Sequence, residues 1–121
     1  MRNFQTLEVW KKGHKLVLSL YKATAEFPKE EQYGLTSQIR RAGASVPANI
    51  AEGCGHDSDK EFSRYLQMAA ASTSELQYQL ILAYDLGYLK ENQYAELSSV
   101  IEELKKMLST FIKRVRARIQ G

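Results

Sequence analysis

Apolar residues recur at three- and four-residue spacing over almost the whole chain, which is the period of an amphipathic α-helix. Only two prolines and seven glycines interrupt this pattern, and runs of β-branched residues are absent. Turn residues divide the pattern into four predicted helices. We expect them at about residues 6–26, at 31–51, from the end of a capping box at 58–61 to residue 86, and from a cap at Asn92 to the fraying end near residue 120.

Local signals define several of the predicted helix ends. Pro28 ends the first helix, because the residue before a proline avoids the α region. Ser58 and Glu61 form a capping box, in which each side chain satisfies a free backbone amide of the third helix. Gly53 and Gly87 are predicted left-handed C-caps of the second and third helices.

The predicted fold class is all-α, an up-down-up-down antiparallel four-helix bundle, because short connections make consecutive helices antiparallel neighbours. The second helix contains Pro47, which removes one backbone donor and clashes with the carbonyl of Gly43, so we expect a kink there. The chain of 121 residues has the length of one domain, predicted to span 1–121, and can form a core without disulfides or metal.

The first helix carries more apolar surface than one core contact requires. Its main stripe is predicted at Leu7, Trp10, His14, Val17, Tyr21 and Thr24. A second row follows Val9, Gly13, Leu16, Leu20, Ala23 and Phe27. The third and fourth helices also have apolar residues outside their main stripes. An exposed apolar face usually marks a partner surface, so we expect a homo-oligomer rather than a monomer.

The net charge of +3 is modest but unevenly distributed. The end of the fourth helix and the start of the first are basic, and the stretch from 57 to 85 is rich in acids. The candidate nucleic-acid-binding residues are Lys105, Lys106, Lys113, Arg114, Arg116 and Arg118, together with Lys11, Lys12 and Lys15. They form either a surface for a polyanion or ordinary solvated helix faces.

A polar set follows one face of the second helix and extends to the third. Its members are Arg41, Ser45, Asn49, Glu52 and Glu75. The structural interpretation is a cluster in which an arginine–carboxylate pair and an amide pin the kinked helix to its neighbour. The alternative is an anion site on Arg40 and Arg41, since guanidinium groups match phosphate geometry.

No combination of residues predicts an enzyme, a metal site or a cofactor. Cys54 is the single cysteine, and with His56 it lacks the further ligands of a zinc site and the third group of a nucleophile triad. A di-iron site needs glutamate three residues before histidine, and neither His14 nor His56 has one. The chain has neither a membrane-spanning apolar run nor a signal peptide, so we expect a cytoplasmic protein.

Several segments together resemble a known family. They are LEVW (7–10), FPKEE (27–31), QIRRA (38–42), SVPANIAEG (45–53), SEL (74–76) and DLGYL (85–89). These segments resemble the signature of the bacterial four-helix-bundle family encoded in intervening sequences of 23S, or large-subunit, ribosomal RNA genes. The resemblance covers nearly the whole chain. One departure lies in the third helix, where relatives often have Arg-Gly and this chain has Ala70 and Ala71.

The resemblance implies a four-helix protomer that assembles into a ring-like homopentamer. The family is also similar to the accessory protein of diversity-generating retroelements, a basic pentameric bundle that associates with nucleic acid and a reverse transcriptase. We therefore expect a non-enzymatic, homo-oligomeric module that binds RNA or DNA through its basic surfaces. The alternative is a scaffold that docks another protein and has no role with nucleic acid.

Overall fold

The computed structural model describes residues 2–120, and every regular element in that range is helical. The four long helices are α1 (Glu8–Thr24), α2 (Leu35–Cys54), α3 (Asp59–Asp85) and α4 (Glu91–Gln120). Two 3₁₀ turns, η1 (Phe4–Thr6) and η2 (Lys29–Glu31), precede α1 and α2. The predicted all-α four-helix bundle is confirmed.

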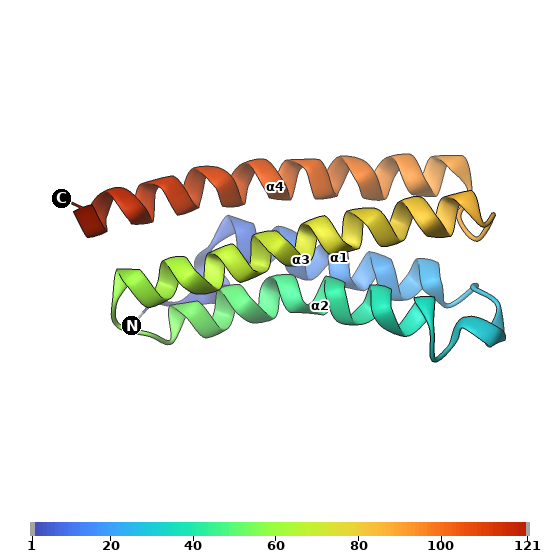
Figure 1. Cartoon of the computed structure of the whole chain (residues 1–121), viewed down its shortest axis with the longest axis horizontal. Coiled ribbons are helices and arrows are strands. Elements are labelled where there is room, and N and C mark those ends of the chain that lie inside the picture. The colour runs from blue at the N-terminus through green and yellow to red at the C-terminus, as the bar shows by residue number, and fades with distance from the viewer. Residues whose placement is uncertain (1, 121) are drawn as a thin grey trace.

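The helices run alternately in opposite directions along one long axis (Figure 1). α1 packs against α2 and α4, and α3 packs against the same two helices. α1 and α3 therefore lie diagonally across the bundle, and their outer faces point to different sides. α2 runs unbroken through Pro47, so the proline does not divide the helix. No helix in the described range is long and apolar enough to cross a membrane.

The buried face of α1 is formed by the second apolar row and not by the row that we predicted as the main stripe. Val9, Gly13, Leu16 and Leu20 are buried, whereas His14 and Tyr21 are exposed. The prediction of the main stripe was wrong, because both rows have helical spacing and the pattern alone does not decide which one faces the core. The outer row remains as a partly apolar surface on α1.

Glycines allow α2 to approach both of its neighbours closely. A Cβ atom added to Gly43 would lie 2.4 Å from Cδ1 of Leu20 on α1. A Cβ added to Gly53 would lie 2.8 Å from Cβ of Tyr65 on α3. Gly53 is buried and helical, so its predicted role as a left-handed C-cap was wrong. Its absent side chain serves the contact between helices α2 and α3.

The first two helix boundaries differ from the prediction because residues 25–34 form a structured turn. α1 ends at Thr24, and α2 begins at Leu35 rather than Glu31. Glu31 instead accepts two hydrogen bonds: its Oε1 from the backbone N–H of Leu35 at 3.1 Å, and its Oε2 from the hydroxyl of Tyr88 at 3.0 Å. Glu31 therefore caps α2 from outside the helix.

At the start of α3 the serine half of the predicted capping box forms, whereas the Glu61 side chain pairs with Arg64; the predicted end of α3 is confirmed, but the predicted start of α4 is not. Ser58 Oγ accepts from the N–H of Glu61 at 3.1 Å, and Gly87 has the left-handed φ of 82°. α4 already begins at Glu91, so the predicted cap at Asn92 was wrong. Gln93 performs a related task, since its Oε1 accepts from the N–H of Lys90 at 2.9 Å.

Candidate nucleic-acid interface

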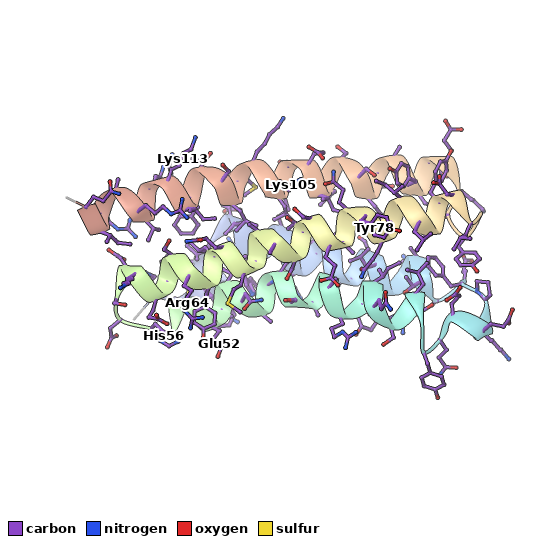
Figure 2. The ribbon with its side chains drawn as sticks, in the orientation of Figure 1. Glu52, His56, Arg64, Tyr78, Lys105 and Lys113 are labelled. Carbon is purple, nitrogen blue, oxygen red and sulfur yellow. The ribbon has the colours of Figure 1, made fainter. Side chains whose placement is uncertain are left out.

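The C-terminal half of α4 forms a basic surface. From Lys105 to Gln120 the helix contains six cations and no carboxylate. The buried stripe of Leu104, Leu108 and Val115 fixes the rotation of α4 against the bundle. Lys106 and Lys113 lie opposite this stripe, and Figure 2 shows Lys113 pointing away from the other helices.

Four of these six cations are available for an external anion. They are Lys106, Lys113, Arg114 and Arg116, and all four are exposed. None of them takes part in the ion pairs that join residues of the described range. We call these four residues the α4 basic surface.

The other two of these six cations bind side chains of α3. Lys105 is half-buried, and its Nζ donates to Oε1 of Gln77 on α3 at 2.9 Å. Arg118 pairs with Asp59 at the start of α3, with its Nε 3.2 Å from Oδ2. Lys105 and Arg118 therefore connect α4 to α3.

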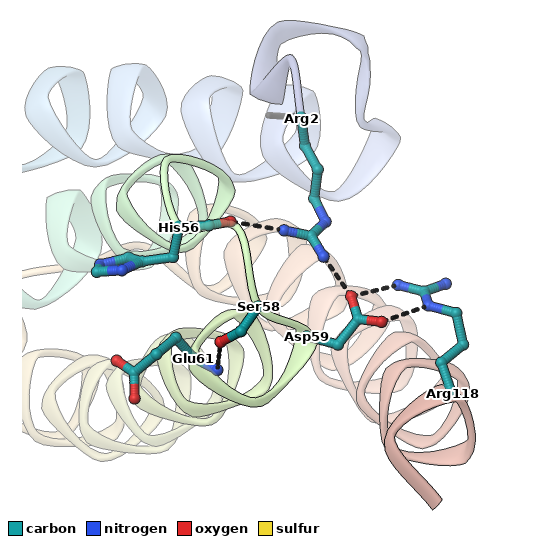
Figure 3. A network of polar contacts seen from close by, with 6 residues as sticks. All are labelled: Arg2, His56, Ser58, Asp59, Glu61 and Arg118. Atoms are coloured by element: carbon teal, nitrogen blue, oxygen red, sulfur yellow. Dashed lines mark hydrogen bonds and ion pairs between the residues drawn. The ribbon is translucent and has the colours of Figure 1, made fainter. Parts of the chain in front are cut away.

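Asp59 is the centre of a network that the sequence did not reveal (Figure 3). It accepts from Arg118 and also from Arg2, whose other terminal nitrogen donates to the carbonyl of His56 at 2.9 Å. The Arg2 guanidinium also lies over the ring of Phe62, 4.1 Å from its centroid. The hydrogen bond from Arg118, aided by Arg2, lowers the pKa of Asp59 below its ordinary value. The network joins the start of the chain, α3 and the end of α4.

The three predicted lysines of α1 lie in a different setting. Lys12 Nζ is 3.0 Å from a carboxylate oxygen of Glu103 on α4, and Lys11 is 3.5 Å from Glu8. Lys15 is exposed on the same side of α1. These lysines line a groove between α1 and α4 that glutamates also line, so they are separate from the α4 basic surface.

The predicted polar cluster forms only in part. Asn49 Nδ2 donates to both the carbonyl and Oγ of Ser45 at 2.8 Å, and Ser45 Oγ lies 2.8 Å from Ser72 Oγ on α3. Arg41 and Glu52 are exposed. The two hydroxyls thus form a polar contact between α2 and α3, and Asn49 bonds to Ser45 within α2.

The expected arginine–carboxylate pair is not part of this contact. Glu75 is exposed and accepts from its helical neighbour Gln79 at 3.2 Å. Arg41 forms no ion pair with a carboxylate of the described residues. The pairing prediction was wrong because Arg41 and Glu75 are both exposed and Glu75 bonds within its own helix.

Arg40, one of the two arginines of the alternative anion site, contacts the end of α1. Its Nε donates to Thr24 Oγ1 at 2.9 Å, and one terminal nitrogen donates to the carbonyl of Tyr21 at 3.2 Å. Its guanidinium also lies 4.4 Å from the centroid of the Tyr21 ring. A cation at the C-terminal carbonyls of a helix is stabilising, so Arg40 has a structural role.

Cys54 and His56 lie in different surroundings. Cys54 is fully buried, and this burial raises the pKa of its thiol. His56 stacks on Tyr65 with the ring centroids 5.0 Å apart. Within residues 2–120, no group of three or more metal-binding side chains comes together.

Comparisons with known proteins agree with the fold and define the family. The family model of the 23S rRNA-intervening sequence protein matches residues 5–110. A crystal structure of a protein of unknown function from the S23 ribosomal protein family of Bacteroides thetaiotaomicron is similar, with 27% identity and a TM-score of 0.78. The similarity covers 87% of this chain and 98% of that chain. No curated protein matches the sequence significantly. The chain belongs to the 23S rRNA-intervening sequence protein family.

Proposed function

We propose that the protein is a non-enzymatic, homo-oligomeric module that binds nucleic acid through the α4 basic surface. The supporting observation is the set of four exposed cations, Lys106, Lys113, Arg114 and Arg116, on a helix half that contains no acid. These four cations have no carboxylate partner in the described range. A polyanion can therefore bind them without the free-energy cost of breaking an internal ion pair.

Binding of this kind depends on contacts with phosphates and has little specificity for the base sequence. The surface is one straight helix face of lysines and arginines, and its residues contact phosphates as cations and hydrogen-bond donors. The family name connects the chain with 23S ribosomal RNA, so structured RNA is the first ligand to test. Duplex DNA is the second, since both carry the same phosphate charge.

Self-association would repeat the α4 basic surface and increase its affinity. Large apolar side chains are exposed on two diagonally placed helices: Leu18 on α1 is 58% exposed and Tyr78 on α3 is 62% exposed. Figure 2 shows Tyr78 on the outward side of α3. Two different apolar faces favour head-to-tail contacts, which close into a ring when the rotation permits. This supports the homopentamer expected from the family resemblance.

The same exposed apolar faces favour the alternative function, a scaffold that docks another protein and does not bind nucleic acid. The two functions differ in their response to salt. Under the first, fluorescence anisotropy of a labelled ribosomal RNA hairpin and of a labelled DNA duplex rises on titration with the protein, and the affinity falls as salt increases. Four contacted phosphates per protomer would give a slope of log K against log salt of about −3 to −4. Absence of binding at low salt would favour the scaffold.

A further inference from the structure

A long groove runs between α1 and α4, with a volume of about 1270 Å³. Its lining extends along α1 from Glu8 to Ala23, a length of about 22 Å at the rise of an α-helix, and continues to Ala25 and Glu26 beyond the end of α1. None of the four residues of the α4 basic surface lines the groove.

The groove exists because short side chains face it from α1. Ser19 and Ala23 line it at the place where a larger residue would fill the space between the two helices. Its apolar lining includes the buried Leu16 and Leu97, and the half-buried Val100 and Met107 on α4. The groove therefore offers an apolar surface that water covers in the free protomer.

The two walls of the groove carry opposite charges. The α1 wall is mainly basic, with Lys11, Lys12, Lys15, Lys22 and one carboxylate, Glu8, which pairs with Lys11, whereas the α4 wall carries Glu96 and Glu103. Across the groove, Lys12 and Glu103 approach each other within ion-pair distance, at 3.0 Å. This pair is largely exposed on the glutamate side, and exposed pairs contribute little to stability, so an incoming charge can replace either partner.

We infer that the groove docks one amphipathic helix of a partner protein. The apolar stripe of that helix lies over Leu97, Val100 and Met107, its acidic edge faces the α1 lysines, and its basic edge faces Glu96 and Glu103. The length of the groove accommodates about 15 helical residues. This mode is the helix-in-groove type of recognition, in which an apolar stripe gives affinity and the flanking charges give orientation.

The shape and charge of the groove disfavour the other occupants. A nucleic-acid strand would bring its phosphates against Glu96 and Glu103. The head-to-tail contact proposed for a second copy uses the faces of Leu18 and Tyr78, and neither residue lines the groove. A single helix, about 10 Å in diameter, fits a concave channel between two helices.

The test uses the full chain and three labelled helical peptides of equal length and equal apolar stripe. One peptide has glutamates along one edge and arginines along the other, the second has glutamates on both edges, and the third has arginines on both. We expect the mixed peptide to bind about tenfold more tightly than either other peptide, which is the effect of a few exposed charge contacts. Equal affinities for all three peptides would contradict the inference.

A pair of substitutions locates the binding site. Ser19→Trp fills the groove without touching the core, whereas Ser74→Trp places the same ring on the exposed face of α3. Circular dichroism verifies that both variants fold. We expect Ser19→Trp to weaken binding of the mixed peptide at least tenfold and Ser74→Trp to leave it unchanged. Unchanged binding by Ser19→Trp would overturn the inference, and so would loss of the homo-oligomer in this variant, which would make the groove an interface between copies.

Discussion

Arg118 near the end of α4 and Asp59 at the start of α3 form an ion pair across 59 positions of sequence, with Nε 3.2 Å from Oδ2. This pair holds the C-terminal part of α4 against the bundle. It also distinguishes Arg118 from the neighbouring Lys113 and Arg114, which are exposed and outside the ion pairs of the described residues. Position in the fold, and not charge alone, decides which cations are available to a ligand.

The Asp59 network makes stability dependent on acid pH. The pKa of Asp59 is lower in the folded than in the unfolded chain, so its contribution is fully present above the unfolded value of about 3.9 and is lost as the pH falls through the folded value. Asp59→Asn removes this contribution at every pH. We therefore expect urea unfolding of the wild type to become easier below about pH 4, with a smaller change in the variant. The same pH dependence in both proteins would contradict this role of Asp59.

Gly53→Ala and Gly13→Ala should have opposite effects on stability. Both glycines are helical and buried, and alanine alone would favour a helix by up to about 1 kcal/mol. At Gly53 the new Cβ meets Tyr65 Cβ at 2.8 Å, which the backbone of α3 holds in place, so we expect destabilisation of about 1–3 kcal/mol. At Gly13 the nearest atom, Val46 Cγ1, is 3.5 Å away, and the variant should be neutral or stabilised. Thermal unfolding of both variants tests the pair, and a stabilised Gly53→Ala would be contrary evidence.

Arg40→Gln should destabilise the bundle by about 1 kcal/mol, because it removes hydrogen bonds to Thr24 and to the carbonyl of Tyr21. Arg41→Gln is the matched control, since the exposed Arg41 should change the free energy of unfolding by less than about 0.5 kcal/mol. Denaturant titration of the two variants gives both values. Equal effects would show that Arg40 does not act through the end of α1.

The sequence predicted the number of helices, their order and the cap at Ser58 because these depend on local periodicity and turn chemistry. It did not decide between the two apolar rows of α1, since a single helix carries no information about which row meets a neighbour. The sequence also did not distinguish the roles of Arg40 and Arg41. Adjacent arginines of a helix point in different directions, and only the packing of α2 shows that Arg40 reaches Tyr21. The pairing of Asp59 with Arg118 depends on the bundle as a whole.

Self-association through the exposed apolar faces can be tested on either helix. Leu18→Glu on α1 and Tyr78→Glu on α3 place a charge on an exposed position, so each should fold and each should shift the protein from oligomer to monomer. Ser99→Glu, at an exposed polar position of α4, is the control and should leave the oligomer intact. Sedimentation velocity measures all four proteins. A wild type that is monomeric at every concentration would contradict the proposed homo-oligomer.

The most direct test of the proposed function compares two triple variants with equal loss of charge. One replaces Lys106, Lys113 and Arg114 with glutamine, and the other replaces Lys22, Lys29 and Lys90, which lie at the opposite end of the bundle. The measurement is anisotropy of a labelled ribosomal RNA hairpin at several salt concentrations. We expect that only the first variant loses at least tenfold in affinity and that the magnitude of its salt slope falls by about 2 to 3. Equal weakening of both variants, or unchanged binding by the first, would contradict the proposed function.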